Sequence, residues 1–321
     1  MSDVPVLAHG AGDPSASWVD LVLVLGLVAL GAGYGRGVHE LWARRGGGQV
    51  VSGGRAAAFA FGLVVALVAQ RGPVHDAAEG SFAGHMAQHM LLMVVAAPLL
   101  AAGAAGLPLT LAAPHRLRRW VGRLRASAVV RWLRRPSQLA LLAGGLHTAV
   151  LWAWHLPAPY AVAVDSAAVH AAEHLSFVGA AWLLWATVLG ARPRGRPDPA
   201  GGVRRPGPAA RAARGLRPAE SLVLPTPVGL LVLFGTGMAA AALGAVLTLA
   251  PTPLYPPDVL ASRDPLADQQ LAGLVMWVPM DVVAFAVAVV LFVRWLARLD
   301  RRTPAGRDLR PADSAAEEMV R

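Results

Sequence analysis

The chain has 321 residues, of which 55% are hydrophobic and 15% charged, with a formal net charge of +10 and no cysteine. The charged residues fall in a few blocks between long uncharged runs, which is typical of a chain that spans a bilayer and excludes an ordinary soluble domain. The absence of cysteine excludes disulfides, thiolate ligands and Cys-x-x-Cys redox chemistry, so any bound metal must have nitrogen, oxygen or thioether ligands.

Seven apolar stretches have about the length of a membrane span, because a spanning helix needs roughly 20 mostly apolar residues. In chain order they are residues 18–34, 55–70, 82–106, 138–155, 168–190, 222–249 and 270–296. The second stretch is the shortest. The sequence therefore predicts an all-α polytopic membrane protein with a short N-terminal segment (1–17), a seven-helix transmembrane domain (18–298) and a disordered cytoplasmic tail (299–321).

The arginines set the predicted orientation. All 29 basic residues are arginine, and they concentrate after the first, third, fifth and seventh stretches. Positive charge collects on the cytoplasmic side of membrane proteins, so we expect the N-terminus outside and the C-terminus in the cytoplasm. A soluble nucleic-acid-binding protein would not confine its arginines between runs of membrane length, and nucleic acid is therefore not an expected partner.

Two basic loops, residues 114–136 and 191–219, are predicted on the cytoplasmic side. The first alternates arginines with apolar residues, which indicates an amphipathic helix on anionic membrane lipids; a solvated loop that only fixes topology is the alternative. The second is rich in Arg, Pro, Gly and Ala and is expected to be disordered. On the outer side, the proline-rich connection 251–268 is either an ordered lid over a site or a stiff linker.

Two histidine pairs open the third and fifth predicted helices. His85 and His89 lie one helical turn apart, as do His170 and His174, so each pair shares one helix face. Both helices run inward from the outer surface, which places the two pairs at the same depth. Polar side chains at that depth are costly in lipid, so we expect them to face the bundle interior and one another.

Further polar side chains lie at the same level. His155 lies near the outer end of the fourth helix, His147 about two turns deeper, and His75 in the outer loop before the third helix. Met86 adds a thioether beside the first pair. Four more side chains could orient the ligands: Glu173, Gln88, Asp268 and Gln269. For Asp268 the alternative is a helix-capping role, because it opens the seventh helix.

These residues predict a metal site near the outer surface. Imidazoles one turn apart can bind one ion, neutral nitrogen ligands suit copper, zinc or iron, and a thioether favours Cu(I). Interfacial histidines bonded to carbonyls and lipid headgroups are the alternative. The spacing His170-x-x-Glu173-His174 also matches the zinc-binding pattern of inverzincin hydrolases, and facing histidines could instead ligate haem b in an electron carrier.

Four blocks of the sequence resemble the CtaG family of seven-helix membrane proteins, which assist the assembly of caa(3)-type cytochrome c oxidase. The blocks are HMAQHMLLMVVAAP (85–98), WHLPAPY (154–160), HAAEHLSF (170–177) and PLADQQLAGLVMWVP (265–279). They lie in the third, fourth, fifth and seventh helices. The similarly named single-span copper chaperones rely on cysteines, which this chain lacks.

The resemblance implies a multi-pass protein of a bacterial plasma membrane that is not an enzyme, contacts cytochrome c oxidase subunits and delivers a copper ion to them. It implies functional positions at His85, His89, His155, His170, Glu173, His174, Asp268 and Gln269. After residue 279 the family commonly has small residues, whereas this chain has Met280 and Asp281. A scaffold that binds oxidase subunits without any cofactor is a further alternative.

Overall fold

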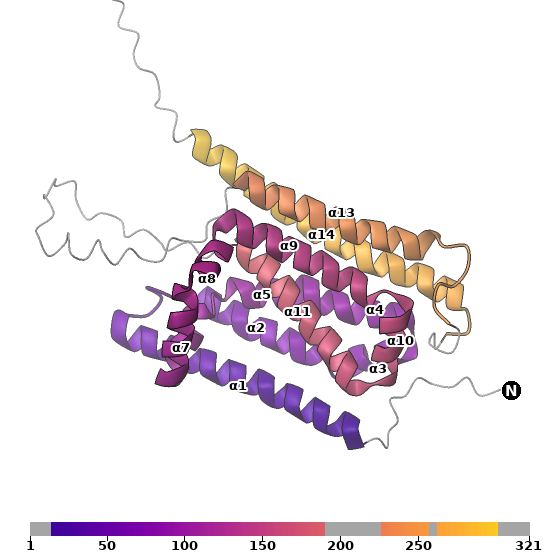
Figure 1. The fold of residues 1–321 in the computed structure, drawn as a ribbon, viewed down its shortest axis with the longest axis horizontal. Coiled ribbons are helices and arrows are strands. Elements are labelled where there is room, and N and C mark those ends of the chain that lie inside the picture. Colours follow the sequence, from indigo (N-terminus) through magenta and orange to yellow (C-terminus); the bar gives the residue numbers. More distant parts are fainter. Residues whose placement is uncertain (1–13, 190–225, 257–261, 301–321) are drawn as a thin grey trace, which may run out of the picture.

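The computed structural model describes residues 14–189, 226–256 and 262–300, and these residues form helices without a strand (Figure 1). Five helices are long and apolar enough to cross a membrane, and two bent helix pairs raise the number to seven if each pair is one span. The predicted all-α polytopic fold is thereby confirmed. The helices pack side by side in one bundle.

The bundle has long helices along its axis and short helices at its ends. Along the axis run α1 (Pro14–Arg45), α2 (Gly53–Ala69), α4 (Phe82–Met90) with η1 (Leu91–Ala96) and α5 (Ala97–Ala102), α9 (Pro136–Trp154), α11 (Ala167–Leu189), α13 (Thr226–Leu249) and α14 (Pro265–Asp300). The short helices are α3 (Pro73–Gly80), α6 (Gly106–Ala112), α7 (His115–Ala126), α8 (Ala128–Leu133) and α10 (Pro157–Asp165).

The short helices mark two opposite ends of the bundle (Figure 1). α7 and α8 lie at one end, and α3 and α10 lie at the other, which we call the outer end after the predicted topology. α1 begins at the outer end and α14 finishes at the α7 end, as an odd number of crossings requires. The orientation of the bundle in the membrane stays a prediction.

α1 is longer than the predicted span 18–34. Arg36, Arg44 and Arg45 lie within this helix rather than in a loop, because the helix continues as far as the three consecutive glycines Gly46, Gly47 and Gly48. Gly46 and Gly48 have φ angles of 87° and 76°, a left-handed conformation that favours glycine. Several apolar side chains of α1 are exposed, as expected of a lipid-facing surface: Trp18, Leu21, Val22, Leu25 and Val28.

The third predicted helix changes its winding directly after Met90, one residue past His89. α4 passes into the π-helix η1, then into α5, which ends at Ala102, four residues before the predicted end of this span. The wider π turn is accompanied by a tertiary hydrogen bond, in which Trp185 Nε1 on α11 donates to the carbonyl of Met93 at 3.1 Å. Single π turns inside α-helices are frequent near functional sites.

α13 and α14 pack closely along their length (Figure 1). A Cβ atom on Gly244 would lie 2.7 Å from the Trp277 side chain, and one on Gly273 would collide with Thr248 Oγ1. Both positions therefore require glycine for the two backbones to approach. Asp281 faces the same interface, since its Oδ1 atom lies 3.2 Å from where a Cβ on Gly237 would be.

The amphipathic helix predicted within the basic loop 114–136 is present as two helices, α7 and α8. The break falls at Ser127, whose hydroxyl accepts a hydrogen bond from Val130 N and so caps α8. Five large apolar side chains of this region are exposed: Leu117, Trp120, Leu124, Val129 and Trp132. Lipid contact by these helices stays a prediction. The loop 191–219 and the segments 1–13 and 301–321 lie outside the described residues.

Candidate metal centre

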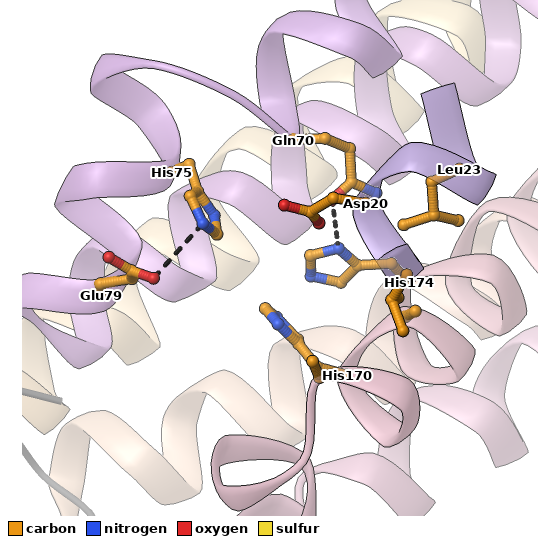
Figure 2. Close-up of a pocket in the computed structure, with 10 residues that line it drawn as sticks. Asp20, Leu23, Gln70, His75, Glu79, His170 and His174 are labelled. Atoms are coloured by element: carbon orange, nitrogen blue, oxygen red, sulfur yellow. Dashed lines mark hydrogen bonds and ion pairs between the residues drawn. The ribbon is translucent and has the colours of Figure 1, made fainter. Parts of the chain in front are cut away.

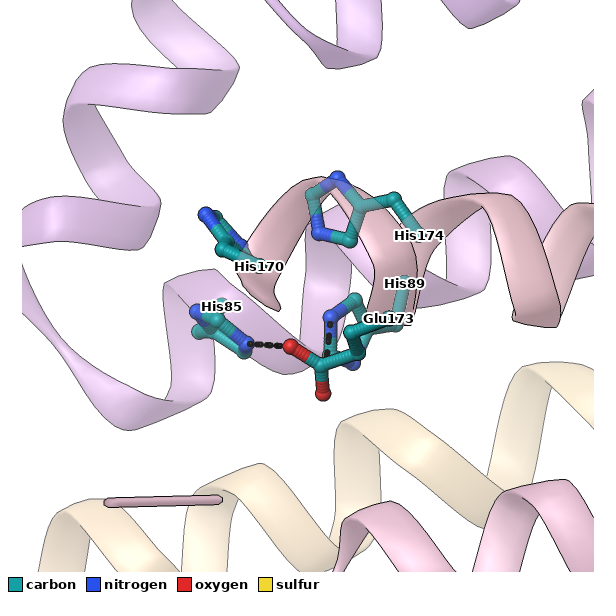
Figure 3. A group of neighbouring side chains, drawn as sticks. All are labelled: His85, His89, His170, Glu173 and His174. Carbon is teal, nitrogen blue, oxygen red and sulfur yellow. Dashed lines mark ion pairs between the residues drawn. The ribbon is translucent and has the colours of Figure 1, made fainter. Parts of the chain in front are cut away.

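Both predicted histidine pairs lie at the outer end of the bundle and meet there (Figure 3). On α4 the ring centroids of His85 and His89 are 4.3 Å apart, and on α11 those of His170 and His174 are 4.2 Å apart. Across the two helices, His85 stacks with His170 at 5.1 Å and His89 meets His174 at 5.0 Å. The four imidazoles therefore form one group.

Glu173 completes this group from α11. Its carboxylate lies 3.9 Å from His85 Nε2 and 3.7 Å from His89 Nε2, and its side chain is 1% exposed (Figure 3). A buried carboxylate in a membrane domain is costly unless a positive charge lies beside it. A bound cation or a protonated imidazole would supply that charge. We call His85, His89, His170, Glu173 and His174 the five-residue cluster.

The dimensions of the five-residue cluster suit a transition-metal ion. One possible ligand atom from each residue can be chosen so that all five lie within 4.8 Å of one another. Two ligand atoms that bind the same ion at about 2.0–2.2 Å lie at most about 4.4 Å apart. Small side-chain shifts are therefore enough for several of these residues to share one ion.

Ring nitrogens of His174 and His89 have lone pairs that a ligand could use. His174 Nδ1 lies 3.0 Å from Gln70 Oε1, and because the amide oxygen only accepts, Nδ1 must carry the proton. In the neutral imidazole Nε2 then has the lone pair, and this buried atom has no hydrogen bond within the described residues. Both ring nitrogens of His89 are likewise buried without a hydrogen bond there. Such atoms are costly unless a ligand or water satisfies them.

His155 and Met86 form a second contact next to the five-residue cluster. His155 Nδ1 donates to the carbonyl of Leu151 at 2.6 Å, so in the neutral ring the lone pair is again on Nε2. This Nε2 atom lies 3.1 Å from Met86 Sδ, and the ring centroid is 6.3 Å from that of His89. Two atoms that offer lone pairs thus face each other in the core.

The remaining predicted histidines lie apart from the five-residue cluster. His147 is buried on α9 and is not a member of the group of close ligand atoms. His75 lies on α3, where its Nε2 atom is 3.3 Å from Glu79 Oε1, one turn further along the helix.

Three polar residues expected to orient the ligands form hydrogen bonds with the backbone. Asp268 accepts from the backbone N–H groups of Phe82 and Ala83 at 2.9 and 3.0 Å, so it caps α4, the helix that carries His85 and His89. Gln269 Oε1 accepts a hydrogen bond from Leu254 N, and Gln269 Nε2 donates one to Leu247 O. These two hydrogen bonds fix the connection between α13 and α14. Gln88 Nε2 donates to Ala69 O at 2.6 Å.

An aromatic group lies on the outer side of His85. The ring of Tyr160 is 5.5 Å from that of His85, and Phe82, Tyr160 and Tyr255 pack edge to face at 4.9 to 5.1 Å. Tyr255 comes from the proline-rich connection, and its hydroxyl donates to His155 O at 2.7 Å. Burial raises the pKa of this hydroxyl, which keeps it a donor. This part of the connection is thus ordered against the site.

Sequence reasoning missed Gln70 and Asp20, which both lie beside His174 and His170 in a cavity. Gln70 directly follows α2, the second apolar stretch, at the predicted outer level. Asp20 lies near the start of the first stretch, at the same level. Their predicted depth was therefore the available signal, and neither residue belongs to a recognisable motif.

The family profile described as cytochrome c oxidase caa3 assembly factor (Caa3_CtaG) matches residues 32–205 and 215–298 of this chain. The matched segments cover most of the sequence and include every residue of the five-residue cluster. Neither the curated proteins nor the solved structures include a significant match.

Proposed function

The chain belongs to the cytochrome c oxidase caa3 assembly factor family, and from that premise we propose that it binds a copper ion in the five-residue cluster and assists its insertion into the oxidase. The observation that carries the metal proposal is the convergence of five possible ligand atoms within 4.8 Å of one another in a buried site. The ion is cargo, so the protein is a metallochaperone and not a catalyst.

The donor atoms favour copper, and Cu(I) in particular. The group offers neutral imidazole nitrogens, which suit copper, zinc and iron. Met86 Sδ, 3.1 Å from His155 Nε2, adds a soft thioether donor beside the five-residue cluster, and soft donors select Cu(I). Glu173 would offset the charge of the ion, while Gln70 keeps the His174 Nε2 lone pair directed at it.

Two geometric features weigh against a haem b site and against the active site of a zinc hydrolase. A haem between axial histidines needs its macrocycle between the two rings, whereas these imidazoles contact one another directly, with centroids 4.2 to 5.1 Å apart. In a zinc hydrolase Glu173 would have to reach both water and substrate, yet it is 1% exposed and lies against His85 and His89. A small ion fits these features better.

The proposal is tested in the host cell by replacing the gene with one that encodes the variant His85→Ala, His89→Ala, His170→Ala, His174→Ala. We expect loss of caa(3)-type oxidase activity and of copper from the purified oxidase, with partial rescue by copper added to the medium. The matched control is the double variant His39→Ala, His115→Ala, because both residues are exposed histidines on α1 and α7.

The same experiment separates the copper role from the scaffold role. Unchanged oxidase activity in the fourfold variant, with the variant present in the membrane at the wild-type level, would support a scaffold without a cofactor and contradict the copper proposal. A reducible Soret band in the purified wild-type protein would support haem b instead.

A further inference from the structure

A cavity of about 110 Å³ lies beside the five-residue cluster, between α1, the end of α2, α3 and α11 (Figure 2). We call it the access cavity, and its polar lining residues are Asp20, Gln70, His75, Glu79, His170 and His174. His170 and His174 thus belong to both the cavity wall and the five-residue cluster. The other three cluster residues, on α4 and α11, do not line the cavity.

Exposure of the polar side chains falls steadily from the mouth of the cavity to the cluster. The side chains of Asp20, Glu79 and His75 are 40%, 30% and 28% exposed. His170 is partly buried, and His174 is 1% exposed. The access cavity therefore connects exposed carboxylates at the outer end with two histidines of the cluster, of which His170 is the more exposed.

We propose that the access cavity is the path by which a metal cation reaches the five-residue cluster, with His75 and Glu79 as a transient outer binding pair and His170 as the ligand that receives the ion. The inference rests on the proposed function, because it presumes that the cluster binds a metal. It adds an outer binding position and a route, neither of which follows from the cluster itself.

The chemistry of the outer pair suits this role. His75 and Glu79 lie one turn apart on α3, with Nε2 and Oε1 3.3 Å from each other, so they can share one ion. The carboxylate of Asp20 lines the cavity from α1, where Arg71 at 3.4 Å offsets part of its charge. Carboxylates at the mouth of a cavity raise the local concentration of cations.

The helix face opposite the outer pair keeps the path open. α11 presents Ala167, His170, Ala171 and His174 to the cavity, which is one face of a helix by their spacing. Alanine at two of these four positions leaves space that a larger side chain would fill. Ala171→Leu should therefore obstruct the cavity without removing a ligand. Ala172→Leu is its matched control, because Ala172 is exposed on the same helix and does not line the cavity.

The test measures the rate and the end point of copper loading separately. Purified protein in detergent takes Cu(I) from its coloured bicinchoninate complex, and the loss of absorbance is followed with time. We expect Ala171→Leu to slow loading at least tenfold while the final copper content equals that of the wild type. Ala172→Leu should load at the wild-type rate.

A second variant tests the outer pair without adding bulk. Glu79→Gln removes one charge near the path, which should slow loading about two- to threefold at low salt and less at high salt. Asp76→Asn is the matched control, since Asp76 is an exposed carboxylate on α3 that does not line the cavity. It should leave the rate unchanged.

The outcomes distinguish failure of the access cavity as a path from failure of the five-residue cluster as a copper site. Wild-type loading rates in both Ala171→Leu and Glu79→Gln would overturn the access path while leaving the cluster as a copper site. Failure of the wild type itself to take up copper would overturn the proposed function, and this inference with it. If Ala171→Leu does not fold, Ala167→Leu replaces it, because Ala167 lines the same side of the cavity. The loading rate of Glu79→Gln then still tests whether the cavity is the path.

Discussion

Replacing Gln70 with leucine removes a hydrogen bond that orients a cluster histidine while leaving every proposed ligand in place. Gln70 Oε1 accepts the Nδ1 proton of His174 at 3.0 Å and thereby directs the Nε2 lone pair into the five-residue cluster. Partners of this kind typically change metal affinity by about 10–100-fold when removed. We therefore expect Gln70→Leu to weaken copper binding by about 1.4–2.8 kcal/mol, since each factor of ten is about 1.4 kcal/mol.

The assay is competition for Cu(I) between the purified protein and a chelator of known affinity. Gln70→Glu keeps an acceptor for the Nδ1 proton and should bind copper at least as tightly as the wild type. Gln270→Leu is the matched control, because Gln270 Nε2 donates to Ala250 O at 3.4 Å and orients no histidine. Equal copper affinity in Gln70→Leu and the wild type would refute the reasoning that this hydrogen bond orients a ligand.

Three further predictions concern the packing that holds the site, each measured by thermal unfolding of the purified protein in detergent. Asp268→Ala removes a charged cap from the start of α4 and should destabilise the fold by about 1–3 kcal/mol, with Asp268→Asn intermediate. Trp185→Phe leaves the Met93 carbonyl without its donor and should cost about 1 kcal/mol. Gly273→Val should prevent α13 and α14 from packing and abolish folded protein, whereas Gly235→Ala, with open space around it, should be tolerated.

Each of these predictions has a result that would contradict it. Unchanged unfolding temperatures for Asp268→Ala or Trp185→Phe would mean that the corresponding hydrogen bonds contribute nothing to stability. A stable Gly273→Val variant would mean that the two helices do not approach as closely at this position as the structure has them.

The meeting of the two histidine pairs was predictable because two independent patterns agree. The one-turn spacing of His85 with His89 and of His170 with His174 fixes each pair on one helix face, and the alternation of arginine-rich loops sets both helices running in the same direction. Together they place both pairs at one depth. Depth alone does not say which helices are neighbours, so the separation of His155 from the five-residue cluster needed the structure.

Other features depend on tertiary contacts that no local pattern encodes. Asp268 was expected either beside the metal ligands or as a cap of its own helix, and no pattern in the sequence indicates that it caps α4, more than 180 residues away in the chain. The π-helix η1 has no sequence signal that distinguishes its apolar residues from those of an α-helix. The C-terminal end of α1 was also misjudged, because Arg36, Arg44 and Arg45 lie beyond the predicted span 18–34 and yet continue the helix.

Copper binding by the five-residue cluster can be measured by elemental analysis of the detergent-purified protein after copper loading and washing. The comparison is between the wild type and the variant His85→Ala, His89→Ala, which loses two of the five possible ligands. We expect near-stoichiometric copper in the wild type and loss of that copper in the variant. Equal copper in both proteins, or none in either, would contradict it.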